Sequence, residues 1–139
     1  MATPKTVTDA SSDLDEAVLN LFLRAGKLQV KVNYAVIAFT AAGNTVAVSG
    51  SFDSDGEIVT GDTSWDAGDV RIEIAITGFT AVPVVLGGII TNSSTNIEKA
   101  RFEAISSSVV AITFLSNATP GAATDPDGDM TVNLFLIGV

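Results

Sequence analysis

The sequence predicts an all-β protein, a jelly-roll-like antiparallel β-sandwich of about eight strands with one short N-terminal helix. Three observations lead to this fold class. Hydrophobic and polar residues alternate along many short segments, which is the period of a half-buried strand. Turn signals rich in Gly, Pro, Asn and Asp separate these segments at intervals of roughly ten residues. A helical pattern occurs near the N-terminus, ahead of the first predicted strand.

The chain is acidic and unusually apolar for its size. Its 139 residues are 47% hydrophobic and 17% charged, whereas about 25% of residues are charged in a typical soluble domain. Sixteen Asp and Glu against seven Lys and Arg give a net charge of -9, so phosphate-rich partners such as nucleic acid and anionic lipid surfaces are disfavoured. The apolar composition favours a homo-oligomer. The alternative is a β-rich monomer with a dense core.

We expect an N-terminal arm at residues 1–12 and a single domain at residues 13–139. The arm is polar, rich in Thr, Ser, Ala and Asp, and lacks the apolar stretch of a signal peptide. The most apolar window, residues 81–90, is too short and too interrupted by Pro and Gly to span a bilayer, so no membrane insertion is expected.

A helix is predicted over residues 13–25, before a β-sandwich over residues 27–139. Acidic residues occupy its first turn and Gly26 follows it as a stop signal. Its apolar residues fall on one stripe at helical spacing. We therefore consider the stripe a candidate oligomer interface, although it could instead cover one end of the sandwich. The stripe includes Leu14, Val18 and Leu21.

The first half of the sandwich predicts four strands. A turn at 42–44, Ala-Gly-Asn, joins the first two strands in a hairpin. The third strand is short and is followed by an acidic loop that runs on through Trp65 to Asp69. The fourth strand has the cleanest alternation, with three isoleucines on one face. The expected strands cover residues 28–36, 45–52, 57–60 and 70–76.

The second half predicts four more strands. Gly87 and Gly88 interrupt the first of them and indicate a bulge or a close approach of another backbone. A long loop at 117–129 precedes the last strand, which is apolar on both faces and should lie centrally in a sheet or at a subunit interface. The expected strands cover residues 84–90, 99–106, 109–116 and 130–139.

The residue inventory excludes several kinds of chemistry. The chain has no Cys and no His, which removes thiolate nucleophiles, imidazole bases and Cys/His zinc sites. Neither glycine-rich phosphate-binding fingerprint occurs. A glycosidase needs a pair of carboxylates. Some such pair is inevitable among sixteen acids, so its presence does not indicate this activity. We assign no catalytic or cofactor-binding residue and expect the protein not to be an enzyme.

Two acidic loops could hold a hard cation such as calcium, which prefers six to eight oxygen ligands. One is the loop at 53–57. The better candidate is the loop at 125–129, in which Pro126 and Gly128 could hold the shape of the backbone. An EF-hand is excluded, because its twelfth position would be Ser64 or Leu136. The favoured interpretation is turn formation by Asp and Gly, so no cofactor is expected and calcium is the lesser alternative. The candidate metal ligands of the better loop are Asp125, Asp127 and Asp129.

The second half of the chain contains a strand at Gly68–Ile74, a segment at Phe79–Val85 in which Phe is followed after a short gap by Pro and Val, and a final strand at Val132–Gly138. In these elements residues 68–139 resemble the C-terminal head domains of bacteriophage tail fibres and the similar H-type lectins. Those heads often carry a tryptophan in the last strand, where this chain has Leu134 or Phe135. The histidines of iron-binding fibre tips are absent. No sugar-binding residue is carried over.

The resemblance implies a homotrimer in a virion, made in the host cytoplasm, with other virion proteins as partners and a host surface glycan as a candidate ligand. The arm and the helix would be the attachment end, and the loops at 53–69 and 117–129 would lie at an exposed tip. The leading interpretation is a tail or baseplate fibre protein that contacts the host surface. The alternatives are a capsid decoration protein that stabilises the shell and a free carbohydrate-binding module.

Overall fold

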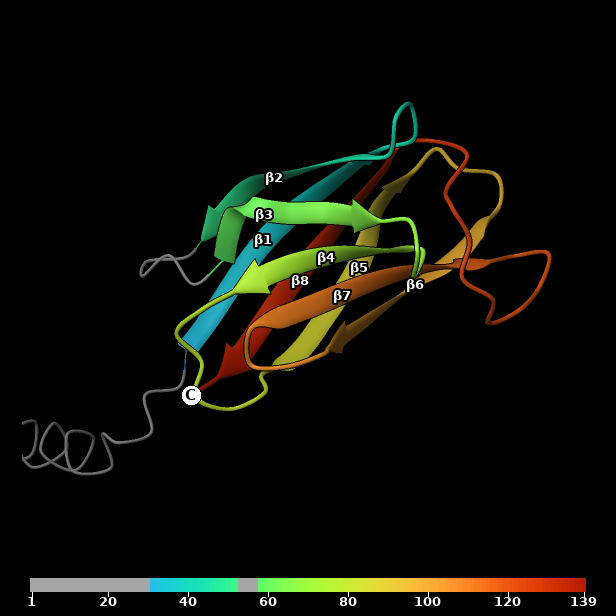
Figure 1. Cartoon of the computed structure of the whole chain (residues 1–139). Coiled ribbons are helices and arrows are strands. Elements are labelled where there is room, and N and C mark those ends of the chain that lie inside the picture. The colour runs from blue at the N-terminus through green and yellow to red at the C-terminus, as the bar shows by residue number, and fades with distance from the viewer. Residues whose placement is uncertain (1–30, 53–57) are drawn as a thin grey trace, which may run out of the picture. The chain divides into compact units, whose positions relative to one another are not determined.

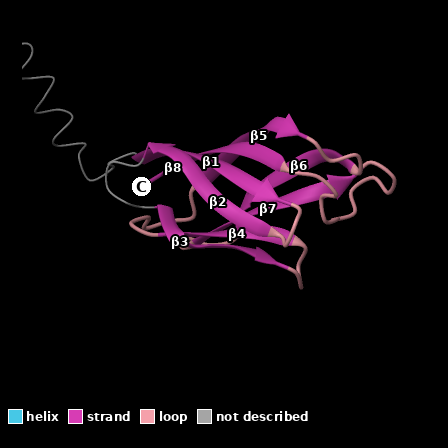
Figure 2. Cartoon of the chain, turned by 90° about the horizontal axis from the view of Figure 1, so that it is seen from above, coloured by secondary structure: helices cyan, strands magenta, loops and turns pink. Residues whose placement is uncertain are grey.

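Two antiparallel four-stranded sheets form the described part of the protein (Figure 1). The structure is a computed structural model, and it describes residues 31–52 and 58–139. The predicted arm at 1–12, the predicted helix at 13–25 with its stripe, and the acidic loop at 53–57 lie outside these residues. Within the described ranges every element is a strand or a loop (Figure 2), and the predicted antiparallel β-sandwich is confirmed.

Each sheet takes strands from both halves of the chain. In sheet A the strand order is β2-β1-β8-β5, and in sheet B it is β3-β4-β7-β6. Sheet A consists of β1 (Lys31–Thr40), β2 (Thr45–Phe52), β5 (Val84–Asn92) and β8 (Met130–Gly138). Sheet B consists of β3 (Ile58–Asp66), β4 (Arg71–Ile76), β6 (Ile97–Ala104) and β7 (Val109–Ser116).

The last four strands follow a Greek key. β5, β6 and β7 are successive neighbours, with β5 beside β6 where the two sheets meet, and β8 returns to pair with β5. The first four strands run as a meander from β1 to β4, with β2 beside β3 at the other edge. Jelly rolls combine two Greek keys, and this sandwich combines one key with a meander. β8 lies between β1 and β5, so its predicted central position is confirmed.

The core lies between the sheets and follows the alternation of the strands. Ile72, Ile74 and Ile76 are buried, as the pattern of β4 predicts. The buried residues of β8 are Met130, Val132, Leu134 and Leu136. Three rings fill one part of the core: the Phe39 ring centroid is 5.0 Å from that of Trp65 and 5.7 Å from that of Phe114.

Two glycine signals have their predicted effects. Gly43 and Asn44 both have positive φ, 91° and 50°, which the tight turn between β1 and β2 requires. A Cβ atom on Gly87 would clash with the ring of Phe102 and lie 2.6 Å from the carbonyl oxygen of Asn133. The predicted close approach is therefore confirmed, while the irregularity in strand pairing lies further along, between Ile89 and Thr91.

The third strand is longer than predicted, and the expectation of an acidic loop through Trp65 to Asp69 is wrong over most of its length. β3 continues to Asp66, so only a turn at 67–70 separates it from β4. Asp62 and Ser64 are exposed, whereas Trp65 packs against the core. Burial of the Trp65 ring offsets the turn-forming tendency of the polar residues around it.

The connections between strands gather at two opposite ends, because paired strands run antiparallel with nearly aligned ends. The first end, which we call the entry end, includes Lys31, the segment at 77–83, the turn at 105–108 and Val139. There the carbonyl oxygen of Val139 accepts a hydrogen bond from the Thr80 backbone N–H, at 2.7 Å. The other end, the loop end, consists of the connections at 41–44, 67–70, 93–96 and 117–129.

Candidate functional site

The loop end is tied together by the carboxylate of Asp127, which joins the 117–129 loop to the 93–96 loop. Its Oδ1 accepts hydrogen bonds from the Ser94 hydroxyl, at 2.6 Å, and from the Thr95 backbone N–H, at 2.7 Å. Its Oδ2 accepts a further bond from the Thr95 hydroxyl. In return the Asp127 backbone N–H donates to the Ser94 hydroxyl oxygen, at 3.2 Å. The two loops therefore hold one fixed arrangement.

These donors also set the ionisation of the group. Hydrogen bonds from the Ser94 and Thr95 hydroxyls, with that from the Thr95 N–H, hold the pKa of Asp127 well below its usual range. All of them favour the ionised carboxylate. Asp127 therefore keeps its negative charge in moderately acidic solution.

The two other acids of the 125–129 segment are used differently. Asp125 contributes its main-chain carbonyl oxygen, which accepts a bond from the Asn96 side-chain amide at 2.8 Å. Asp129 Oδ1 accepts a bond from the backbone N–H of Ala41, at 3.0 Å, and so connects the loop to the β1–β2 turn. The three carboxylates are not brought together as metal ligands among the described residues. The geometry favours the turn-forming role, and calcium binding by this loop stays a prediction.

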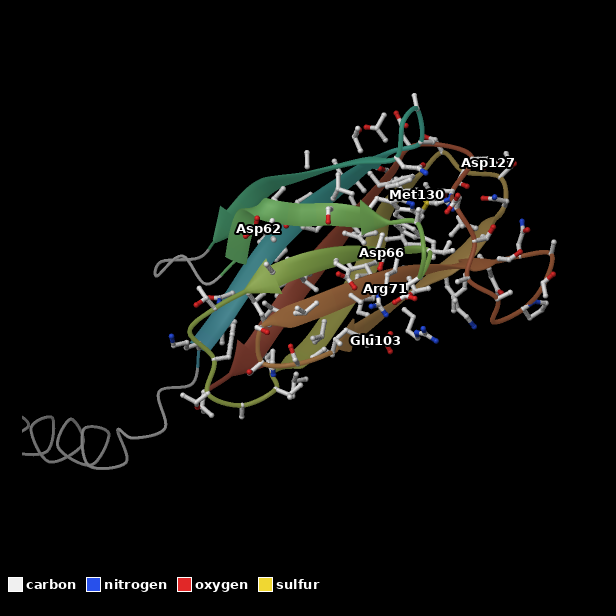
Figure 3. All side chains as sticks on the ribbon, viewed as in Figure 1. Asp62, Asp66, Arg71, Glu103, Asp127 and Met130 are labelled. Carbon is white, nitrogen blue, oxygen red and sulfur yellow. The ribbon has the colours of Figure 1, made fainter. Side chains whose placement is uncertain are left out.

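A different carboxylate group lies on sheet B. Oxygen atoms of Asp66, Asp69 and Glu73 come within 4.8 Å of one another. The guanidinium of Arg71 lies beside these carboxylates, with its Nη2 2.7 Å from Asp69 Oδ2 and 2.6 Å from Glu73 Oε1. The hydrogen bond to Glu73 raises the pKa of Arg71. In Figure 3 Arg71 and Asp66 lie on sheet B, whereas Asp127 lies among the loops. The guanidinium pairs with two of the three acids, Asp69 and Glu73, so this cluster is an ion-pair network that keeps a net negative charge.

The sequence analysis does not predict this ion-pair network, although the spacing of its charged residues is visible in the sequence. Asp69, Arg71 and Glu73 stand at alternate positions, which places Arg71 and Glu73 on the same face of β4. Opposite charges at this spacing indicate a surface ion pair. Such pairs contribute little to stability when exposed, and the network suits a solvated surface.

The outer face of sheet A is apolar. Cross-strand pairing places Val32, Ile137 and Val84 in one row and Tyr34, Phe135 and Leu86 in the next, from β1 across β8 to β5. We call these six residues the apolar face. Four of their side chains are substantially exposed: Val32 at 54%, Val84 at 59%, Leu86 at 54% and Phe135 at 37%.

The outer face of sheet B is charged in contrast. Its outward positions on β3, β4 and β6 alternate with core residues, and the long charged side chains cover the strand β7 between β4 and β6. The charged residues there are Asp62, Asp66, Arg71, Glu73, Lys99, Arg101 and Glu103. The two faces of one sandwich thus differ sharply in their chemistry.

Comparisons with known proteins found no family model, no curated protein and no solved structure that matches the chain. A search of the described residues for a long apolar helix that could cross a membrane found none.

Proposed function

We propose that the chain is a non-enzymatic structural protein of a phage virion, the head of a homotrimeric tail or baseplate fibre that contacts the host surface. The observation that carries this proposal is the two-ended arrangement of the sandwich. Lys31, where the described domain begins, and Val139 both lie at the entry end. The longest described loop, at 117–129, lies at the opposite end. A head joined to the virion through its N-terminal segment would present the loop end outward.

The chemistry of the loop end supports contact with a polar ligand. The connections at 93–96 and 117–129 are rich in Ser, Thr, Asn and Asp and contain no Lys or Arg. Their arrangement is fixed by the Asp127 network and by a bond from the Asn117 side-chain amide to the Thr95 carbonyl oxygen, at 2.7 Å. Loops that are held in place before binding lose less conformational entropy when a ligand arrives. Acceptor-rich, preorganised loops suit the hydroxyl groups of a surface glycan.

Binding of the full chain to a glycan array tests the proposal. We expect selective binding that Asp125→Lys weakens about tenfold or more, because the new charge stands among the exposed acceptors of the loop end. The matched control is Glu103→Lys, which makes the same charge change on sheet B. It breaks only a surface ion pair with Arg101 at 3.4 Å, so its binding should equal that of the unchanged protein.

Two results would contradict the fibre proposal. One is equal loss of binding in both variants, which would mean that net charge rather than the loop end governs the contact. The other is no glycan binding together with tight binding to purified phage capsids and a higher disassembly temperature. That outcome would assign the protein to capsid decoration instead.

A further inference from the structure

We infer that the 93–96 loop protects the peptide unit between Asp127 and Gly128 from isomerisation, the spontaneous rearrangement that moves the main chain into the aspartate side chain. The site lies in the chain itself and needs no partner, so it goes beyond the proposed function and does not depend on glycan binding. Two features support it. The loop binds both oxygen atoms of the Asp127 carboxylate, and its backbone packs against Gly128.

The dipeptide Asp-Gly, which stands at 127–128, is where a protein chain isomerises most readily. The glycine nitrogen attacks Cγ of the protonated carboxyl group and a C–N bond forms. One carboxyl oxygen leaves as water, with the carboxyl proton and the amide proton. Addition of water to the resulting five-membered imide then gives either Asp or isoaspartate. Glycine favours the reaction because it has no Cβ and its backbone rotates most freely.

The carboxylate of Asp127 is bound at both oxygen atoms. Oδ1 accepts from the Ser94 hydroxyl and from the Thr95 backbone N–H, at 2.6 Å and 2.7 Å, and Oδ2 accepts from the Thr95 hydroxyl. Ring closure draws Cγ toward the Gly128 nitrogen and expels one of the two oxygens. It therefore breaks bonds to the 93–96 loop whichever oxygen leaves.

The same donors keep the group in its less reactive form. They stabilise the ionised carboxylate, so the pKa of Asp127 lies well below its usual range. The nitrogen attacks the protonated carboxyl group, since an ionised carboxylate is a poor electrophile and has no ready leaving group. At neutral pH the reactive fraction of Asp127 is therefore smaller than that of an Asp in an unfolded chain.

Gly128 is restrained by the backbone of the same loop. A Cβ atom at this position would clash with the Ser93 carbonyl oxygen and would lie 2.8 Å from the Ser94 nitrogen. The flanking main chain is bonded on both sides, because the Asp127 N–H donates to the Ser94 hydroxyl oxygen and the Ser93 N–H donates to the Asp129 carbonyl oxygen. The contact that requires glycine here also opposes the rotation that ring closure needs.

Isomerisation would undo the arrangement permanently. In isoaspartate the main chain passes through Cβ and Cγ, which adds one atom to the backbone, and the carboxylate stands directly on Cα. The bonds from Ser94 and Thr95 could not re-form with the same geometry. Protection of this dipeptide therefore preserves the order of the loop end.

The rate of isoaspartate formation tests the inference. The full chain is incubated at neutral pH, folded or in concentrated urea, and analysed by peptide mapping, in which Asp and isoaspartate peptides have equal mass and different retention. We expect position 127 to react about tenfold or more slowly in the folded protein, because only the locally open state reacts. The second Asp-Gly, Asp55 with Gly56, is the reference in urea, where both dipeptides should react at similar rates.

A pair of matched variants tests the role of the loop. Thr95→Ala removes the hydroxyl donor to Oδ2 and should speed the reaction at Asp127 several-fold in the folded protein. Thr95→Ser keeps a hydroxyl and should restore the slow rate. The control is Thr119→Ala, the same change at an exposed position of the 117–129 loop that makes none of the bonds to Asp127. Circular dichroism verifies folding, and Ser94→Ala replaces Thr95→Ala if that variant does not fold.

Three results would overturn the inference. One is an equal rate at position 127 in the folded protein and in urea, and another is a faster rate in the folded protein, which would mean that the donors activate the carboxyl group. The third is an equal rate in Thr95→Ala and Thr119→Ala, which would mean that the loop hydroxyls give no protection. Loss or gain of glycan binding bears on the proposed function alone.

Discussion

The carboxylate of Asp127 connects residues that are 33 positions apart in the chain. Its hydrogen bonds to Ser94 and Thr95 are made by the ionised form, since every donor points at a lone pair of the carboxylate. The group is exposed, so solvent weakens each bond individually. Its effect on the protein is to order the loop end, where a ligand would bind under the proposed function.

Acid should therefore loosen this end. Because the pKa of Asp127 is lowered in the folded state, its contribution to stability is present above about pH 4, the usual value for an unfolded Asp, and is lost as the pH falls further. We expect Asp127→Asn to melt at a lower temperature than the unchanged protein at pH 7. The two melting temperatures should approach each other progressively as the pH falls below about 4.

Asp125→Asn serves as the control in the same loop, because Asp125 uses its main-chain oxygen to accept from Asn96. Its melting curve should follow that of the unchanged protein at each pH. A constant difference between Asp127→Asn and the unchanged protein across the whole range would contradict the linkage. It would mean that shape rather than charge holds the two loops.

At the scale of single elements, β8 has two faces with two different roles. Leu134 is fully buried in the core, whereas its neighbour Phe135 is 37% exposed on the apolar face. Leu134→Ala should lower the free energy of unfolding by about 2–5 kcal/mol at any protein concentration, because it leaves a cavity. Phe135→Ala should act mainly through association, so its effect should shrink as the protein is diluted.

Urea unfolding at a low and a high protein concentration distinguishes the two variants. If the Phe135→Ala effect were independent of concentration and as large as that of Leu134→Ala, Phe135 would be a core residue. Phe135 would then make no contribution to association through the apolar face. The comparison is well matched, because both residues stand on the same strand in adjacent positions.

The sequence predicts best those strands that contain several β-branched residues. β7 and β2 have their predicted bounds, and the isoleucines of β4 are buried as expected. The predicted third strand ends too early, because the Asp and Ser residues at alternate positions of β3 are also common in turns. Local preference also gives no information about the rings that pack against Trp65. Pattern alone also left the strand order open, since β8 pairs with β1 across almost the whole domain.

The candidate site shows the same limit. The acids at 125–129 were visible in the sequence, but their partners Ser94 and Asn96 stand in another loop that only the fold brings near. The apolar surface of the last strand was predicted as central or interfacial, and the structure provides the central position. Which apolar side chains remain exposed depends on the neighbouring strands, so the apolar face could be recognised only from the fold.

At the scale of the whole molecule, an acidic protein with one uncharged face has opposing long-range and short-range forces. The net charge of -9 repels another copy at a distance, while the apolar face attracts it on contact. Repulsion between exposed charges is screened by salt, whereas burial of apolar surface is not weakened by it. The balance between the two forces therefore depends on ionic strength.

Raising the salt concentration should strengthen the proposed association. Between about 10 mM and 150 mM salt the screening length falls from about 30 Å to about 8 Å, so the dissociation constant measured by sedimentation should fall several-fold. Association of the Leu86→Asp variant should also strengthen with salt. It should remain weaker than that of the unchanged protein at every salt concentration, because the added charge lies on the apolar face. Dissociation on adding salt would instead mean that ion pairs hold the copies together. Salt weakens contacts between opposite charges and leaves apolar contacts intact. The interface would then be expected on the charged outer side of sheet B, where Arg71 and Arg101 form ion pairs with neighbouring acids.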